Sequence, residues 1–373
     1  MMKIVVDENM PYAAELFSQF GDVIPLSGRT ISAADLHDVD ALMVRSVTQV
    51  NEALLAQANK LAFVGTATIG IDHLDQPLLQ QRNIEYTNAP GCNAVSVGDY
   101  VCSALLVLAE QQGFTFADKS IAVIGVGNTG AQTVSRLTAL GADVMLCDPP
   151  RVEKEGLAGF VSLEKALQAD IICLHVPLVK TGSHQTKHLL TAELLAGIAQ
   201  DAILVNSGRG DVIDNQALLE LKQAGHGMTL VLDVWENEPT PLLELIPYAA
   251  IATPHIAGYS LEGKARGTEM IYQAYAQFIG QQADRSISDI LPIPAISRID
   301  INQSADQTFV KSLVHLVYDV RRDDAIFRKN IMKAGSFDEM RKNYLERREF
   351  SSLRLVNESH YAVESLYQLG FAK

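Results

Sequence analysis

Short apolar runs of strand length alternate with helical stretches through the first quarter of the chain. The apolar runs are 3–6, 41–44 and 62–64, and the helical stretches lie near 12–20 and 52–58. Strands that alternate with helices are typical of a parallel sheet with right-handed crossover connections. We therefore predict an α/β unit over residues 1–93, which ends at the breaker Asn88-Ala89-Pro90-Gly91.

The same alternation starts again after residue 93. Expected strands are 121–124, 144–147, 171–174, 202–205, 229–234 and the shorter 251–253, and expected helices are 94–111, 215–223 and 261–278. The last helix is long enough to return to the first unit, so we assign 259–283 to that unit and 94–258 to the second. The predicted fold is α/β, with two doubly wound parallel sheets and a cleft between them.

The end of the chain has a different pattern. Turn signals around Leu291-Pro292-Ile293-Pro294 indicate a linker, and the charge-rich stretch 337–348 has helical spacing. We expect residues 284–373 to form a third unit. Two possibilities stay open for Arg347 and Arg348: they are solvated, or an arginine reaches the cleft of a partner subunit.

Charge and cysteine usage limit the partners of this protein. The formal net charge of −14 argues against a surface for nucleic acid or an anionic membrane. The most apolar helical segment, 100–109, is shorter than the ~20 residues of a bilayer span, and the acidic N-terminus is not typical of a signal peptide. The four cysteines form no CxxC pair and no metal-ligand spacing. We expect a cytoplasmic protein with buried, reduced thiols, no metal, no nucleic acid and no membrane.

A glycine-rich turn joins the strand at 121–124 to the next helix. Gly125 permits the tight turn, Gly127 lets the backbone approach a pyrophosphate, and Gly130 lets the helix pack close to the sheet. Free N–H groups and the dipole at the helix N-terminus favour phosphate there. The turn predicts a dinucleotide-binding unit with cofactor contacts at Gly125, Gly127, Asn128, Thr129 and Gly130.

An acidic residue closes this unit at the end of the next strand. Asp148 lies 18 residues after Gly130, where a carboxylate can accept the ribose hydroxyls of NAD. The same carboxylate would repel the 2′-phosphate of NADP, so NAD is the predicted cofactor. Arg151 is the nearby cation that leaves NADP open.

Three polar segments follow strand-like runs later in the chain. They carry Arg209 in Asn206-Ser207-Gly208-Arg209-Gly210, Glu238 before Pro239, and His255 after Pro254. Oxidation of a 2-hydroxy acid needs a base near neutral pKa for the hydroxyl proton, which suits histidine. It also needs a carboxylate to stabilise the imidazolium and a guanidinium to hold the substrate carboxylate. We predict Arg209, Glu238 and His255 as this catalytic set, with Glu236 as the rival carboxylate.

Four motifs together resemble the D-isomer-specific 2-hydroxyacid dehydrogenases. They are GVGNTG, NSGRG, DVWENEP and TPHIAG, and the resemblance covers about residues 1–280. It implies that Arg209, Glu238 and His255 form the active site and that further cofactor contacts come from several strand ends. Those contacts are Asp148, the segment His175-Val176-Pro177 (Val176 and Pro177), Ser207, Gly208, Asp233 and Gly258. One departure is Asp99, where members commonly have glutamate.

Other stretches resemble members of this family that act on a small phosphorylated hydroxyacid. MVRSVT at 43–48 and HLVYDVRRDDA at 315–325 extend the resemblance to nearly the whole chain. It implies that 284–373 is an α+β dimerisation domain and that the protein is a homodimer. Residue types at the predicted cleft suit an anionic substrate. The candidate substrate contacts are Arg45, Ser46, Thr66, Thr68 and Tyr259.

Two other functions remain open at this point. A 3-phosphoglycerate dehydrogenase or a broad 2-ketoacid reductase would use the same catalytic set. An NAD-sensing scaffold without catalysis would use the same fold, although the intact trio of Arg209, Glu238 and His255 argues against it.

Overall fold

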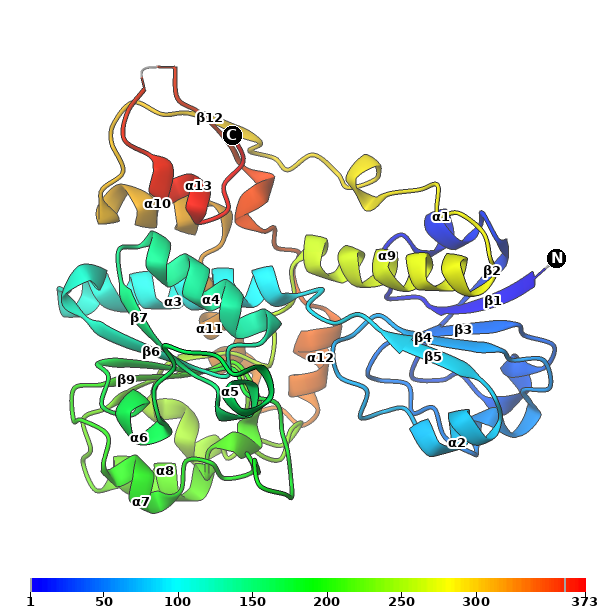
Figure 1. Cartoon of the computed structure of the whole chain (residues 1–373), viewed down its shortest axis with the longest axis horizontal. Helices are drawn as coiled ribbons and strands as arrows, with labels where there is room; N and C mark the ends of the chain where they lie inside the picture. Colours follow the sequence, from blue (N-terminus) through cyan, green and yellow to red (C-terminus); the bar gives the residue numbers. More distant parts are fainter. Residues whose placement is uncertain (1, 359) are drawn as a thin grey trace. The chain divides into compact units, whose positions relative to one another are not determined.

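The chain folds into two compact units in the computed structural model, which describes residues 2–358 and 360–373. The first unit comprises Met1–Asn93 and Ser260–Ile293, and the second comprises Ala94–Tyr259 and Pro294–Lys373. Figure 1 shows the chain coloured along its sequence. The first division thus falls between Asn93 and Ala94. Residues 294–373 pack with the second unit, and a separate domain starting at 284 stays a prediction.

The first unit is built on a five-stranded parallel sheet in the order β2-β1-β3-β4-β5. Its strands are β1 (Met2–Asp7), β2 (Gly21–Leu26), β3 (Ala41–Val44), β4 (Phe63–Thr66) and β5 (Glu85–Asn88). Ile4 and Val6 point into one core with α1 and α9, and Val5 points into a second core with α2. Both faces are therefore covered, which is why the short strands β3 and β4 are buried throughout.

The helices of this unit only partly follow the sequence pattern. They are α1 (Ala13–Phe17), α2 (Gln76–Gln81) and α9 (Leu261–Phe278). The predicted bounds of α9 are confirmed, and Ser260 caps it by accepting the Gly263 N–H. The prediction of an α-helix over 52–58 is wrong, because these residues form only a 3₁₀ turn at Leu54–Gln57.

The second unit contains a six-stranded parallel sheet in the order β11-β10-β9-β8-β6-β7. This order reverses direction next to β6, as in a doubly wound dinucleotide-binding fold, and the fold prediction is confirmed. The strands are β6 (Ser120–Ile124), β7 (Asp143–Cys147), β8 (Ile171–Leu174), β9 (Ile203–Asn206), β10 (Thr229–Leu232) and β11 (Ala249–Ala252).

Helices cover both faces of this sheet. Alternate residues of β6 point to opposite cores, so that Ile121 and Val123 face α3 while Ala122 and Ile124 face α8. The helices are α3 (Ala94–Gln112), α4 (Asn128–Ala139), α5 (Pro149–Glu155), α6 (Leu163–Ala166), α7 (Ala192–Ala196) and α8 (Asn215–Gln223). By length and hydropathy α3 resembles a membrane span, but 83% of it is buried inside the structure, as expected of a core helix. All four cysteines are free and buried, as predicted.

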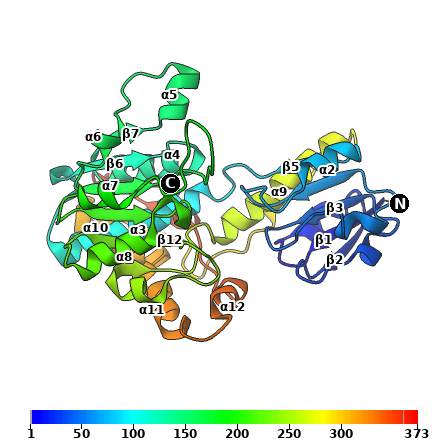
Figure 2. The same cartoon turned by 90° about the horizontal axis from the view of Figure 1, so that it is seen from below.

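The C-terminal segment, residues 294–373, shares the core of α3. Leu313, Phe350 and Leu366 belong to the same buried cluster as Leu105 on α3. Figures 1 and 2 show α11 and α12, in orange, side by side. The elements of this segment are β12 (Arg298–Asp300), β13 (Arg354–Val356), α10 (Gln307–Val317), α11 (Val320–Asn330), α12 (Ser336–Lys342) and α13 (Glu364–Gln368). The two strands pair in parallel.

The helix predicted over 337–348 is wrong in its second half. α12 ends at Lys342, and the chain continues without regular structure into the core. Of the two possibilities for Arg347, a solvated side chain is wrong, because Arg347 is 3% exposed. Its Nη2 donates to the carbonyls of Ser96 (2.8 Å) and Ala257. These tertiary bonds, and the ring of Tyr318 at 4.0 Å from the guanidinium carbon, override the local helical spacing.

A buried ion pair joins α3, α4 and the C-terminal segment. Asp99 Oδ1 accepts from Arg136 Nε at 3.1 Å, and Asp99 Oδ2 accepts from the Phe350 N–H at 3.1 Å. Both side chains of the pair are less than 8% exposed. Asp99, the departure from the family pattern, is thus a cross-link between three segments.

We predict that Asp99→Leu alone destabilises the second unit by about 3 kcal/mol or more, because it leaves the Arg136 charge buried without its partner. The double variant Asp99→Leu/Arg136→Met should recover much of that loss. Chemical unfolding followed by circular dichroism measures both effects. A double variant no more stable than Asp99→Leu would contradict this account of the pair.

Candidate active site

At the glycine-rich turn between β6 and α4, the backbone passes close to the residues that follow β8. Gly125 has a φ of +87°, and a Cβ there would lie 2.8 Å from the backbone of His175 and Val176. A Cβ on Gly130 would lie 2.0 Å from the Gly125 carbonyl oxygen. Both positions therefore require glycine, one for conformation and contact and the other for contact.

The third glycine of this turn faces open space. A Cβ on Gly127 would meet no atom within 4 Å, and Gly127 provides no side-chain cap for α4. The first turn of α4, which contains Asn128 and Thr129, carries no acidic residue. The amide groups at this helix end are thus suited to an anion, and the turn fits the pyrophosphate of a dinucleotide.

Asp148 lies beside this turn at the end of β7. Its Oδ2 accepts from the Val126 N–H at 2.8 Å, and its Oδ1 caps α5 by accepting from the Arg151 N–H at 3.3 Å. Arg151 Nη1 donates to the Val126 carbonyl at 2.5 Å, and its Nη2 pairs with Glu155 at 2.7 Å. Arg151, the cation because of which NADP stays an alternative, is therefore hydrogen-bonded to the glycine turn and ion-paired within its own helix.

The predicted catalytic residues follow three neighbouring strands. Arg209 comes three residues after β9, Glu238 six after β10 and His255 three after β11. Since these strands are adjacent and parallel, the structure brings all three residues to one edge of the sheet. Any Cβ at position 210 would lie 1.9 Å from the Trp235 carbonyl carbon, so this position requires glycine. The segments that carry Arg209 and Glu238 therefore contact each other through their backbones.

Glu238 and His255 form a short hydrogen-bonded pair. The distance between His255 Nδ1 and Glu238 Oε2 is 2.7 Å, and Glu238 Oε1 accepts from the Trp235 N–H at 2.9 Å. Burial alone would raise the pKa of Glu238, but His255 and the Trp235 N–H outweigh it and hold this pKa below its usual value. Glu238 is therefore an anion at neutral pH.

Asp233 anchors the segment that carries His255. This carboxylate is 1% exposed and accepts from the Thr253 hydroxyl (2.7 Å) and from the N–H groups of Ile256 (2.8 Å) and Ala257 (3.0 Å). Burial raises the pKa of Asp233. We predicted this residue as a nicotinamide contact; the structure shows that it also fixes the loop around His255.

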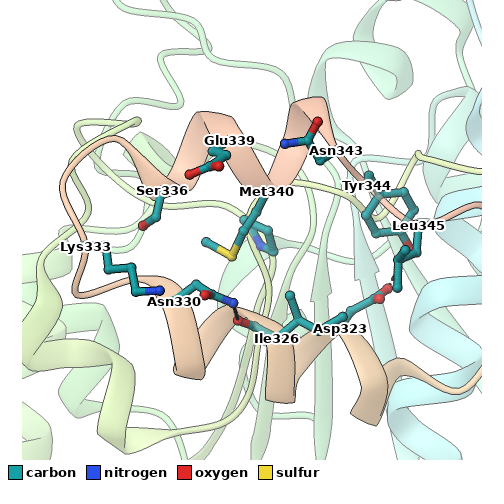
Figure 3. A pocket seen from close by; sticks show the side chains of 11 residues that line it. Asp323, Ile326, Asn330, Lys333, Ser336, Glu339, Met340, Asn343, Tyr344 and Leu345 are labelled. Carbon is teal, nitrogen blue, oxygen red and sulfur yellow. Dashed lines mark hydrogen bonds between the residues drawn. The ribbon is translucent and has the colours of Figure 1, made fainter.

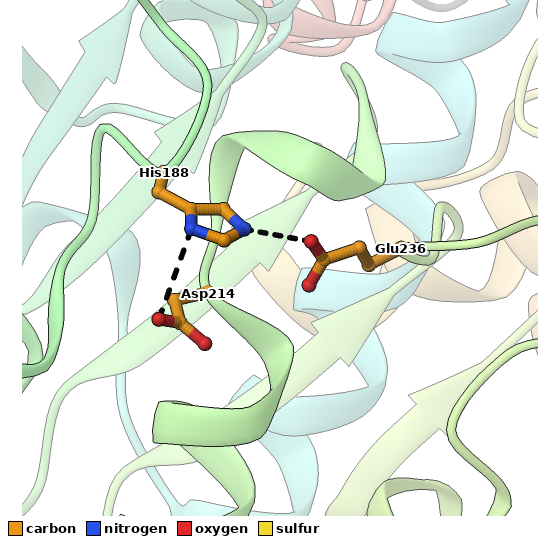
Figure 4. A group of neighbouring side chains, drawn as sticks. All are labelled: His188, Asp214 and Glu236. Atoms are coloured by element: carbon orange, nitrogen blue, oxygen red, sulfur yellow. Dashed lines mark hydrogen bonds and ion pairs between the residues drawn. The ribbon is translucent and has the colours of Figure 1, made fainter.

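Glu236, the rival carboxylate, faces away from this pair toward His188. His188 Nε2 lies 2.7 Å from Glu236 Oε1, and His188 Nδ1 lies 3.8 Å from Asp214 Oδ2, as Figure 4 shows. The three side chains come within reach of one metal ion. However, the two carboxylates meet opposite nitrogens of the imidazole, which is the arrangement of an ion-pair bridge. Sequence reasoning missed His188, which no motif marks.

The other predicted cofactor contacts lie at the same sheet edge. Val176 and Pro177 follow β8, Ser207 and Gly208 follow β9, and Gly258 follows β11. Ser207 Oγ lies 3.4 Å from His175 Nδ1, and burial lowers the pKa of His175 to about 4, so this imidazole is neutral. Their roles toward a cofactor stay predictions.

The predicted substrate contacts of the first unit follow β3 and β4. Arg45 and Ser46 come directly after β3, and Ser46 is exposed. Thr66, at the end of β4, is fully buried and its hydroxyl lies 2.8 Å from both His73 Nε2 and the Thr68 hydroxyl. The threonine hydroxyls therefore shape the turn. An anion contact through this loop stays a prediction.

Two family descriptions match this chain. "D-isomer specific 2-hydroxyacid dehydrogenase, NAD binding domain" matches residues 106–257, and "Domain of unknown function (DUF3410)" matches residues 290–370. Among curated proteins, the erythronate-4-phosphate dehydrogenase of Tolumonas auensis is 52% identical over 100% of this chain and 99% of its own length. That of Aeromonas salmonicida is 54% identical over 99% of each chain.

Solved structures share the fold over about three quarters of the chain. The TT0316 protein from Thermus thermophilus is 25% identical with a TM-score of 0.63, covering 76% of this chain and 99% of that one. An NAD⁺-bound 3-phosphoglycerate dehydrogenase of Entamoeba histolytica is 20% identical with a TM-score of 0.64, covering 75% and 95%. At that identity the likeness concerns the fold alone.

We predict that Glu238→Gln lowers kcat roughly 100-fold, because a neutral amide no longer stabilises the imidazolium of His255. The matched control is Glu236→Gln, whose carboxylate faces His188 and should change kcat far less. Steady-state rates with saturating cofactor measure both. Equal losses in the two variants would contradict the assignment of Glu238.

We also predict that Asp148→Ala weakens the preference for NAD over NADP, because the carboxylate that repels a 2′-phosphate is gone. The ratio of kcat/KM for the two cofactors measures this preference. Glu155→Ala serves as the control, since it removes the ion pair of Arg151 within α5 and keeps the Asp148 carboxylate. An unchanged ratio in Asp148→Ala would refute the contact.

Proposed function

Since the chain belongs to the erythronate-4-phosphate dehydrogenases, within the D-isomer specific 2-hydroxyacid dehydrogenases, we propose that it oxidises 4-phospho-D-erythronate. The product is 2-oxo-3-hydroxy-4-phosphobutanoate, and NAD is the cofactor. The observation that carries this proposal is the hydrogen-bonded Glu238–His255 pair, at the edge of a sheet whose glycine turn suits a pyrophosphate. We place the reaction in the biosynthesis of pyridoxal 5′-phosphate.

His255 acts as the base in this proposal. Its Nδ1 is engaged by Glu238, so Nε2 is the nitrogen that receives the C2 hydroxyl proton of the substrate. As the O–H bond breaks, the C2–O bond becomes a carbonyl and the hydrogen on C2 leaves with its electron pair. Bound NAD supplies the acceptor for that hydride. The anionic Glu238 stabilises the imidazolium that results.

Arg209 holds the acid end of the substrate. A guanidinium binds a carboxylate through two parallel hydrogen bonds and also polarises the adjacent C2 oxygen. Arg209 Nη1 donates to the Gly208 carbonyl at 2.8 Å, which restrains the guanidinium. Further N–H groups of this guanidinium serve the substrate.

The phosphate end requires other donors. We assign Arg45, Ser46, the loop at Thr66 and Thr68, and Tyr259 to it, on the strength of residue type and position after strand ends. A homodimer formed through the C-terminal segment and a cytoplasmic location complete the proposal.

We expect the purified protein to reduce NAD with 4-phospho-D-erythronate at a kcat/KM at least 10-fold above that with 3-phospho-D-glycerate. Both substrates carry a carboxylate, a 2-hydroxyl and a phosphate, and they differ by one carbon in the spacing between the charged ends. Absorbance of NADH under steady-state conditions measures the rates, with His255→Ala as the inactive control. A clear preference for 3-phosphoglycerate would overturn the substrate assignment. A protein that binds NADH yet oxidises neither acid would instead support a non-catalytic scaffold.

A further inference from the structure

An arginine from the C-terminal segment lies near the hydrogen-bonded pair of Glu238 and His255. Arg341 is on α12, within the region that matches a domain of unknown function. Its guanidinium carbon lies 5.8 Å from the ring centroid of Tyr259, and the two side chains are hydrogen-bonded. Tyr259 comes four residues after His255 and is a predicted substrate contact.

The packing of α12 explains why Arg341 reaches this corner. α12 and α11 enclose a cavity of about 270 Å³ whose lining includes Pro254, the residue before His255. Figure 3 shows Met340 and Tyr344 directed into this cavity. The ring of Tyr344 in turn packs edge-on against Tyr259 at 5.7 Å. The helix that carries Arg341 therefore packs near the segment after β11 that carries His255.

The charge of Arg341 is only weakly compensated by its own helix. Asp338 lies 3.6 Å from Nη1 and is itself 41% exposed. Burial alone would lower the pKa of Arg341, but Tyr259 and the Glu238 carboxylate outweigh it, so the side chain stays charged. Arg341 also contributes to the depressed pKa of Glu238.

One donor of this guanidinium has no acceptor. Arg341 Nε is buried, and no atom within residues 2–358 or 360–373 accepts a hydrogen bond from it. An unmet charged donor is costly to bury. Helix packing alone gives no reason for a cation here, since an apolar side chain would fill the same position between Tyr259 and Phe337.

We propose that Arg341 is a positioning residue of the reaction, through which the C-terminal segment completes the active site. It donates to the Tyr259 oxygen, so that the tyrosine keeps its own hydrogen to donate to an oxygen of the anionic substrate. The guanidinium also adds positive charge where the anionic substrate binds. This inference rests on the proposed function and extends it to the domain of unknown function.

A double-mutant cycle between Arg341 and Tyr259 tests the inference. We expect Arg341→Met to raise KM for 4-phospho-D-erythronate about 10-fold or more, and to change kcat less, because a hydrogen bond to the substrate is weakened. In a Tyr259→Phe background the same substitution should raise KM less than about 3-fold. Lys342→Met, on the next and exposed residue of α12, is the matched control and should leave KM unchanged.

Two further measurements separate positioning from folding. NADH affinity and the thermal midpoint should change little in Arg341→Met, and Arg341→Lys should recover part of the KM loss. If Arg341→Met fails to fold, the same cycle run with Arg341→Lys answers the question. KM effects of Arg341 and Tyr259 that multiply independently, or a loss confined to thermal stability, would overturn the inference.

The outcomes also distinguish this inference from the proposed function. A wild type active on a different 2-hydroxy acid would overturn the substrate assignment, and the cycle would then be run with that acid. A wild type without dehydrogenase activity on any of them would overturn both. An active wild type with uncoupled Arg341 and Tyr259 would overturn the inference alone.

Discussion

One buried carboxylate fixes the geometry on which the active site depends. Asp233 accepts three hydrogen bonds from Thr253, Ile256 and Ala257, and so sets the path of the chain on both sides of His255. His255 itself has a φ of +58°, a conformation that a non-glycine residue keeps only when its surroundings define it. With that loop fixed, the imidazole meets Glu238 at 2.7 Å. The position of His255 relative to Glu238 thus depends on the buried carboxylate of Asp233.

Much of this arrangement was predictable from the sequence, because parallel strands place their carboxyl ends at one edge. The sequence pattern predicts the glycine turn and most strands of the second unit. The rule on strand ends and the family resemblance predict Arg209, Glu238 and His255 as neighbours. In the sequence, only the Glu238-Pro239 dipeptide and its match to the family motif favour Glu238 over Glu236. The structure gives the physical difference, since the two carboxylates diverge toward His255 and His188.

Other features have no local signal. Arg347 has the sequence context of a surface residue in a charge-rich stretch, and only its bonds to Ser96 and Ala257, far away in the sequence, bury it. Arg341 has the same kind of sequence context, and its contact with Tyr259 follows from how α12 packs rather than from any motif. β5 was missed because its side chains are only half-buried, so the apolar pattern of a strand is weak there. Long-range packing decides each of these cases.

The shared core of α3 and the C-terminal segment has an evolutionary consequence. In this chain the segment packs against α3 of the dehydrogenase unit, and apolar side chains of both belong to one buried cluster. Deleting it would expose that cluster to water, so the segment is not a detachable module that could be gained or lost by recombination at the linker alone.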